Sequence, residues 1–162
     1  MLQGEAGFKA TEGGLMADIQ VLVGSTYGNA GQIADDCTEQ LNNLGHKAVL
    51  LSEPAYEQVI AQPDVLLICT ATIGQGEIPA NLMPLYCQLK DRSPDFTKVR
   101  FGLIALGDSS YESFAEGGKQ MNELMYDLGA KPVGQALFID SCETPDPDEA
   151  AAEWIDEWST KL

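Results

Sequence analysis

Three segments of the chain combine glycines with hydroxyl-bearing residues, which are types that hold phosphates and polar rings. The first, VGSTYGNAGQ (residues 23–32), follows an apolar run and precedes a stretch with helical period. Its hydroxyls, its glycine and the free N–H groups of a helix that begins near Ala30 are suited to bind a phosphate without a lysine. Considered alone, an ordinary strand-to-helix turn explains the same residues equally well.

The second and third segments cover residues 70–79 and 107–114. Gly74 and Gly76 lie between polar residues in the second segment, and Tyr111 is an aromatic residue on a turn in the third. Each feature alone is explained as turn punctuation or as a surface aromatic side chain. Their joint occurrence after successive apolar runs indicates a ligand site.

Apolar runs alternate along the chain with stretches of helical period, which predicts an α/β protein. We expect strands over 19–24, 47–51, 64–71, 98–107 and 131–140. Helices are expected over 30–45, 81–90, 113–129 and 146–162, with a weaker helical stretch over 53–61. The continuous apolar run 65–69 implies burial on both faces of a sheet. The pattern predicts a doubly wound, five-stranded parallel sheet with right-handed crossovers.

The three segments follow the first, third and fourth expected strands. In open α/β sheets, ligands bind beyond the carboxyl ends of the strands, where the strand order reverses. We therefore expect the three segments to converge on one site.

The length of 162 residues fits one domain. Residues 1–15 show no strand or helix period, so we interpret them as a flexible N-terminal arm and 16–162 as the folded domain. Nine Lys and Arg against twenty-five Asp and Glu give a net charge of -16. This charge disfavours nucleic acid and anionic membranes as partners, and it favours a basic patch on another protein.

The four cysteines form no CxxC pair and His46 is the only histidine, so the ligands of a zinc site are missing. Cys37, Cys69 and Cys87 lie in helix-like or apolar stretches, where we expect them to pack as small apolar residues. We expect His46, which follows Gly45 at a turn, to point to solvent. Trp154 and Trp158 are four residues apart, which predicts a pair facing the core on the last helix. Without a signal-peptide pattern or a long apolar run, the chain is expected to be cytoplasmic.

Taken together and in this order, the three segments resemble the flavodoxin family over most of the chain from about Asp18. Residues 25–30 match its phosphate-loop pattern, and 70–79 resemble the T-x-G-x-G-x-x-P form of diflavin-reductase FMN domains and of small, MioC-like flavodoxins. The string ALGDSSYESF matches the pattern L-G-x-x-x-Y-x-x-F of the family, and AAEWIDEW is similar to its last helix. The connection before that helix has no long insertion, which is typical of the short-chain type.

The resemblance implies a three-layer fold with strand order 2-1-3-4-5, and bound FMN with its phosphate in the first segment and its ring between the other two. Tyr111 would stack on one face of the ring, and the peptide near Gly74 would hydrogen-bond the flavin N5 when it is protonated. Tyr27 stands where Thr is common, and its ring would crowd the phosphate or contribute only its backbone N–H. Ile73 stands where many relatives have an aromatic, so only one ring face gains a stacking partner and the affinity for FMN is expected to be modest. The implied cofactor-binding residues are Ser25, Thr26, Tyr27, Gly28, Asn29, Ala30, Thr70, Ala71, Thr72, Ile73, Gly74, Gly76, Leu106, Gly107, Asp108, Tyr111 and Phe114.

The function implied is a monomeric carrier that shuttles single electrons at low potential between an NAD(P)H-dependent flavoprotein reductase and a protein acceptor. Glu77 and Asp108 would disfavour an anionic reduced flavin. Two alternatives stay open, an NAD(P)H-dependent flavin or quinone reductase on the same scaffold and a binding protein that has lost its flavin. A phosphoacceptor receiver domain is disfavoured, because the third and fifth strands end in Cys69-Thr70 and Ile139-Asp140 instead of Asp and Lys.

Overall fold

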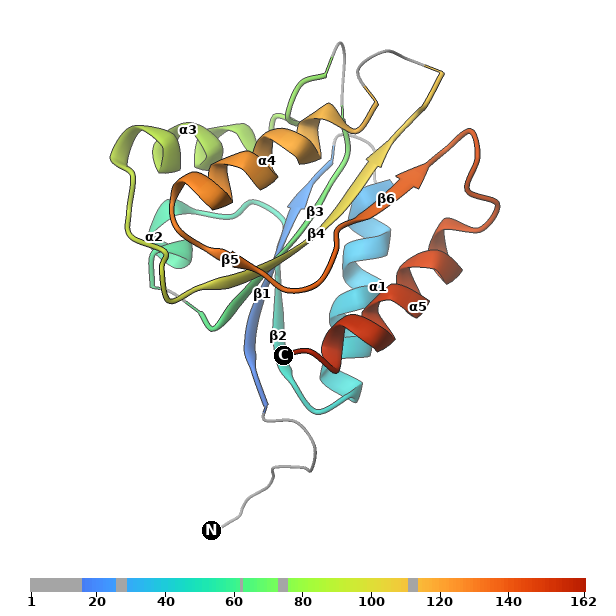
Figure 1. Cartoon of the computed structure of the whole chain (residues 1–162), viewed down its shortest axis with the longest axis horizontal. Helices are drawn as coiled ribbons and strands as arrows, with labels where there is room; N and C mark the ends of the chain where they lie inside the picture. Colours follow the sequence, from blue (N-terminus) through green and yellow to red (C-terminus); the bar gives the residue numbers. More distant parts are fainter. Residues whose placement is uncertain (1–15, 26–28, 62, 73–75, 111–113) are drawn as a thin grey trace, which may run out of the picture.

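A parallel sheet forms the middle layer of the molecule (Figure 1). The computed structural model describes residues 16–25, 29–61, 63–72, 76–110 and 114–162, so the expected arm over 1–15 lies outside the described residues. The strands are β1 (Asp18–Gly24), β2 (Lys47–Leu51), β3 (Val65–Thr70), β4 (Arg100–Gly107), β5 (Lys131–Pro132) and β6 (Leu137–Asp140). Their order is β2-β1-β3-β4-β5, and β6 pairs with β4 farther along the same edge. The predicted order 2-1-3-4-5 is confirmed.

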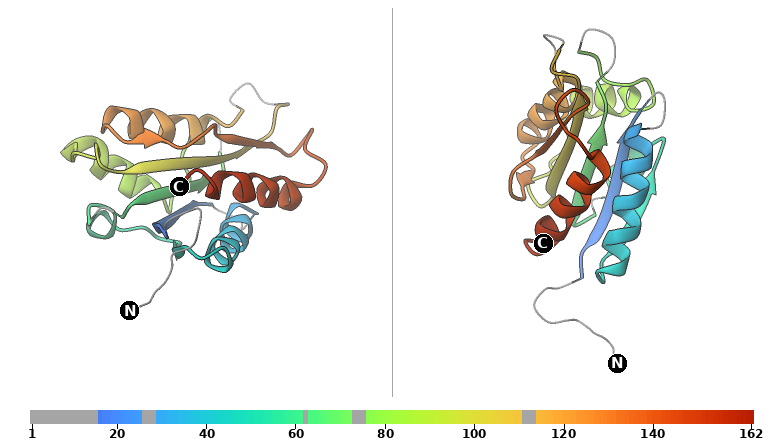
Figure 2. Two further views of the ribbon diagram at one scale, coloured as in Figure 1. Left: turned by 60° about the horizontal axis from the view of Figure 1, so that its bottom comes forward. Right: turned by 90° about the vertical axis from the view of Figure 1, so that its right-hand side faces the viewer.

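Five helices among the described residues cover the two faces of the sheet (Figure 2). They are α1 (Asn29–Asn43), α2 (Tyr56–Val59), α3 (Met83–Arg92), α4 (Glu116–Asp127) and α5 (Pro147–Ser159). Helices α1 and α5 lie on one face, and α2, α3 and α4 lie on the other. Two separate apolar clusters fill the spaces between the helices and the sheet, so the fold has three layers.

Local sequence signals explain most of these elements. All six residues of β3 are buried, as the continuous apolar run predicted. Gly45, two residues after the end of α1, adopts a φ of 98°, a conformation that glycine reaches without steric cost and that stops a helix. Pro84 lies in the first turn of α3, where its missing N–H has no helical partner to lose.

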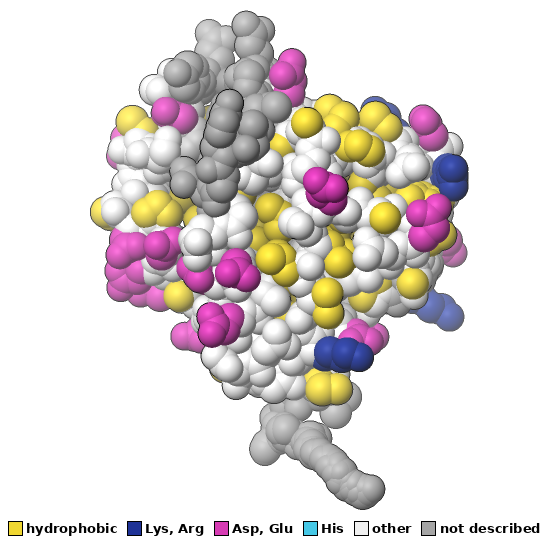
Figure 3. All heavy atoms as spheres, turned by 180° about the vertical axis from the view of Figure 1, so that it is seen from behind, with side chains coloured by type: hydrophobic (Ala, Val, Ile, Leu, Met, Phe, Trp, Pro, Cys, Tyr) yellow, Lys and Arg dark blue, Asp and Glu magenta, His cyan; other side chains and the backbone are white. Residues whose placement is uncertain are grey.

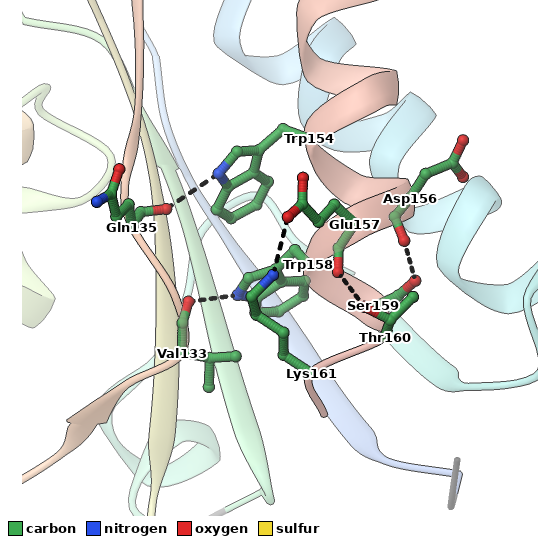
Figure 4. Close-up of polar contacts among 9 residues, drawn as sticks. All are labelled: Val133, Gln135, Trp154, Asp156, Glu157, Trp158, Ser159, Thr160 and Lys161. Atoms are coloured by element: carbon green, nitrogen blue, oxygen red, sulfur yellow. Dashed lines mark hydrogen bonds and ion pairs between the residues drawn. The ribbon is translucent and has the colours of Figure 1, made fainter. Parts of the chain in front are cut away.

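The fifth strand differs from the prediction, because the expected strand 131–140 is split into β5 and β6. Gly134 has a φ of 66°, which takes the chain out of the extended conformation. Two carbonyls of the connecting segment accept indole N–H groups from α5, Val133 from Trp158 at 3.1 Å and Gln135 from Trp154 at 3.0 Å (Figure 4). The two tryptophans thereby hold the connection between β5 and β6 outside the ladder.

Two single-residue expectations are also corrected. The His46 side chain is half-buried, and its Nδ1 atom accepts the N–H of Ala17 at 3.1 Å instead of facing only solvent. Burial lowers the pKa of His46. Cys87 was expected to pack as a small apolar residue, but it is exposed because it lies on the outer side of α3.

Within the described ranges, none of the helices has the length and apolarity needed to span a membrane.

Candidate functional site

The carboxyl ends of β1, β3 and β4 lie side by side at one edge of the sheet (Figure 1). In the parallel registers, Gly24 pairs with Thr70, and Thr70 pairs with Ala105. The segments that follow these residues therefore leave the sheet next to one another. The strand order reverses between β1 and β3, which is where open α/β sheets bind ligands.

The entrance to the first segment is fixed by hydrogen bonds from its neighbours. The N–H of Ala71 donates to the carbonyl of Gly24 at 2.7 Å, and the N–H of Ser25 donates to Oδ1 of Asn81 at 2.9 Å. A Cβ on Gly24 would collide with the hydroxyl of Thr70, so glycine is required here. The start of the first segment is thus clamped between β3 and the residues that precede α3.

The start of α1 has the charge distribution of an anion site. No acidic residue lies in its first turn, whereas α4 begins with Glu116 and α5 carries Asp148 in its first turn. The first N–H groups of a helix lack helical partners and carry partial positive charge. Ala30 is fully buried in this turn, and its carbonyl accepts the Cys69 thiol at 3.4 Å. This set of neutral N–H donors without a carboxylate fits the phosphate of FMN.

The second segment is anchored to α4 at two points. The hydroxyl oxygen of Thr72 accepts the N–H of Gly117 at 3.0 Å, and the side-chain amide of Gln120 donates to the carbonyl of Gly76 at 2.6 Å. Gly76 has a φ of 101°, in the region that favours glycine. The Thr70 hydroxyl is buried and donates to the carbonyl of the next residue at 2.9 Å. Both described ends of this segment are therefore held by side-chain hydrogen bonds.

The third segment bends sharply after β4. A Cβ on Gly107 would lie 2.5 Å from the backbone N of Ala115, so only glycine permits this close approach. One carboxylate oxygen of Asp108 accepts both the hydroxyl of Ser110 at 2.6 Å and its N–H at 2.9 Å. These bonds, the hydroxyl first, hold the pKa of Asp108 below its usual value. The carboxylate therefore stays ionised beside the candidate site.

Two other predicted site residues, Leu106 directly before this segment and Phe114 at its end, pack against the core. The Leu106 side chain is half-buried and packs against the apolar cluster under α1 and α5. The Phe114 ring packs against the cluster on the opposite face, 6.4 Å from the ring centre of Phe138, and Lys119 Nζ lies 5.9 Å from its centre. Six candidate residues lie outside the described residues, namely Thr26, Tyr27, Gly28, Ile73, Gly74 and Tyr111.

Negative charge surrounds this edge of the sheet. Asp140, at the end of β6, accepts the N–H of Ser109 and that of Cys142, both at 2.9 Å. Hydrogen bonds, that from the Ser109 side chain first, lower the pKa of Asp140 as well. Figure 3 shows acidic side chains spread over one face of the molecule, with Lys and Arg toward its right and lower margins. Among the described residues, no three His, Cys, Asp or Glu side chains are placed to share a metal ion.

Sequence reasoning missed two polar residues at this site, Asn81 and Gln120. Both had been assigned only to expected helices. Asn81 lies 56 residues from its partner Ser25, and Gln120 lies 44 residues from Gly76. Because both partners are distant in sequence, no local pattern distinguishes these residues from ordinary polar positions.

The comparisons with known proteins agree with this geometry. The model of the Flavodoxin family matches residues 21–154. Flavodoxin YqcA of Escherichia coli is 38% identical over 148 residues, which cover 91% of this chain and 99% of that protein. Protein MioC of Escherichia coli is 34% identical over 147 residues, again 91% of this chain and 99% of that protein. The chain therefore belongs to the flavodoxin family, whose proteins bind FMN and have an electron-transfer fold.

Two further matches extend the comparison. A solved mutant of a flavodoxin from Pseudomonas aeruginosa superimposes with a TM-score of 0.82 at 36% identity, covering 88% of this chain and 97% of that one. The sulfite reductase [NADPH] flavoprotein alpha-component of Bacillus subtilis is 34% identical over 141 residues. That match covers 86% of this chain but 23% of the larger protein. The domain is thus similar both to free-standing flavodoxins and to part of a larger flavoprotein.

Proposed function

We propose that this protein is an FMN-dependent carrier that passes single electrons at low potential from an NAD(P)H-dependent flavoprotein reductase to a protein acceptor. The observation that carries the proposal is that β1, β3 and β4 end next to one another where the strand order reverses, beside a helix start free of carboxylates. Bound FMN supplies the redox chemistry, because it accepts and releases electrons reversibly. The protein contributes binding, orientation and electrostatics.

The FMN phosphate is proposed to bind to residues 25–30. Because the Ser25 N–H is engaged by Asn81, the backbone donors are those of the following residues and of the first turn of α1. No Lys or Arg lies in this segment, so neutral N–H groups and hydroxyls hold the anion.

The flavin ring is proposed to lie between the second and third segments. Tyr111 would stack on one face of the ring, and the peptide near Gly74 would accept the N–H of a protonated N5. The bonds of Thr72 to Gly117 and of Gln120 to Gly76 support this arrangement, because they tie the second segment to α4 on either side of residues 73–75. The peptide at Gly74 would then be free to rotate between two anchored residues, Thr72 and Gly76.

The low potential follows from the charges around the ring. Asp108 and Asp140 remain ionised at neutral pH, since hydrogen bonds lower the pKa of each. Glu77 is exposed in the second segment. Adding an electron to a flavin beside fixed negative charges is unfavourable, which lowers its reduction potential. The net charge of -16 also favours a partner with a basic docking surface.

Titration of the apoprotein with FMN, followed by reductive titration under anaerobic conditions, tests the proposal. We expect binding of FMN, two separated one-electron steps, and no bleaching by NAD(P)H alone. Rapid bleaching by NAD(P)H without an added reductase would instead support the flavin or quinone reductase. Absence of FMN binding would leave only the binding protein without flavin.

A further inference from the structure

A single side-chain amide links three segments of the chain at the candidate phosphate site. Asn81 lies between β3 and α3 and is half-buried. Its Oδ1 atom accepts the N–H of Ser25 at 2.9 Å. Its Nδ2 atom donates to the carbonyls of Val23 and Ser52, each at 2.7 Å. The end of β1, the residue after β2 and the segment before α3 are therefore connected through one side chain.

These bonds fix the direction in which the chain leaves β1. An amide NH₂ has two hydrogens, and both are used on carbonyls from different segments, so the amide plane is set by its partners. Asn81 hydrogen-bonds to the backbone on either side of Gly24, at Val23 and at Ser25. The next residue, Leu82, is fully buried, and its Cδ2 atom lies 2.9 Å from the position that a Cβ on Gly24 would occupy. Residues 81–82 thus hold the three residues that lead into 26–30.

We propose that Asn81 is a positioning residue for the phosphate-binding segment. It acts through the backbone of residues 23–25 without touching the cofactor. By accepting the Ser25 N–H, it fixes the direction in which the chain enters residues 26–30. This inference rests on the proposed binding of FMN. It goes further than that function, because it assigns part of the affinity for the phosphate to Asn81. This residue lies outside the three segments and was not among the predicted cofactor-binding residues.

The test compares FMN with riboflavin, which lacks the phosphate. Asn81→Ala removes all three hydrogen bonds, so the dissociation constant of FMN is expected to rise about tenfold, the factor for about 1.4 kcal/mol. The dissociation constant of riboflavin should change less than about twofold, because its ring contacts lie in the other segments. Asn81→Ser, which retains a shorter hydroxyl, should give an intermediate value and serves if the alanine variant folds poorly.

Asn42→Ala is the matched control. Asn42 makes the same kind of contact, because its amide donates to the carbonyl of Ala48 at 3.1 Å and accepts the N–H of Ala48 at 2.9 Å. These bonds lie at the start of β2, at the amino ends of the strands, whereas the candidate site lies at their carboxyl ends. Asn42→Ala should lower the urea midpoint of the apoprotein without changing the ratio of the two dissociation constants.

The outcomes separate the two claims. The positioning role is overturned if Asn81→Ala leaves FMN affinity unchanged, if riboflavin weakens as much as FMN, or if Asn42→Ala changes their ratio equally. If the unsubstituted protein binds no FMN, the proposed function fails and this inference fails with it. A selective loss of FMN affinity in both Asn81 variants, and not in the control, supports the proposal.

Discussion

The two tryptophans of α5 offer a direct test of what holds the split edge strand. Their rings are stacked with centroids 5.3 Å apart, and each indole N–H binds one carbonyl of the β5–β6 connection (Figure 4). Their environments differ. Trp158 is 2% exposed and its acceptor Val133 is 8% exposed, whereas Trp154 is only partly buried and its acceptor Gln135 is exposed.

Trp158→Phe removes the indole N–H and leaves the carbonyl of Val133 without that partner in a site that water does not readily reach. A buried polar group without a partner costs about 1 to 3 kcal/mol. The lost ring area adds about 1 kcal/mol. A Cβ on Gly102 would lie 2.7 Å from the Trp158 ring, so the ring packs directly on β4 and the smaller Phe leaves a gap there. The free energy of unfolding should fall by about 2 to 4 kcal/mol.

Trp154→Phe is the matched comparison. The exposed carbonyl of Gln135 can bind water once the indole is removed, so the expected loss is about 1 kcal/mol or less. Urea unfolding without added FMN, followed by circular dichroism, gives both values at the same pH and salt. An equal loss in the two variants, or a larger loss in Trp154→Phe, would refute the argument that burial of the acceptor decides the cost.

Three further predictions concern Gly31, His46 and the four cysteines. Gly31→Ala should raise the free energy of unfolding in urea by about 0.5 to 1 kcal/mol, because a Cβ on this α1 residue meets no atom within 4 Å; a loss of stability would contradict this. The pKa of His46 is lower in the folded than in the unfolded chain, so its stabilising effect should be complete above about pH 6.5 and be lost as the pH falls through the folded-state pKa. His46→Gln, which can still accept the N–H of Ala17, should flatten that part of the urea-midpoint profile, and an unchanged profile would count against it. A thiol reagent should label the exposed Cys87 and Cys142 rapidly in the native protein and the two buried cysteines only in denaturant, as measured by mass spectrometry; rapid native labelling of all four would show that the interior opens.

Much of the fold was predictable because its signals are local. The apolar run that forms β3 and the helical spacing that forms α1 depend on neighbouring residues, and the structure places both within two residues of the expected bounds. The split between β5 and β6 was missed, although Pro132 and Gly134 are local signals of an interruption within 131–140. The contribution of α5 was not visible in this stretch, because no residue in 131–140 indicates that its carbonyls accept the indole N–H groups of Trp154 and Trp158.

The candidate site was also predictable only in the part that depends on local sequence. The three segments were found because glycines and hydroxyls follow apolar runs, and parallel strands bring their ends to one edge. The support around them comes from Asn81 and Gln120, whose bonds cross 56 and 44 residues of sequence. His46 was misjudged for the same reason, since its partner Ala17 lies 29 residues away. Side-chain bonds to a distant backbone depend on the finished fold.

The interruption between β5 and β6 has a consequence for how the molecules behave in a crowded solution. A long, straight outer strand invites another chain to extend the sheet by edge-to-edge pairing. Here Pro132 in β5 has no N–H to offer, and the turn at Gly134 breaks the outer strand. Two short pieces replace one continuous template, so this border of the sheet resists intermolecular strand addition and aggregation.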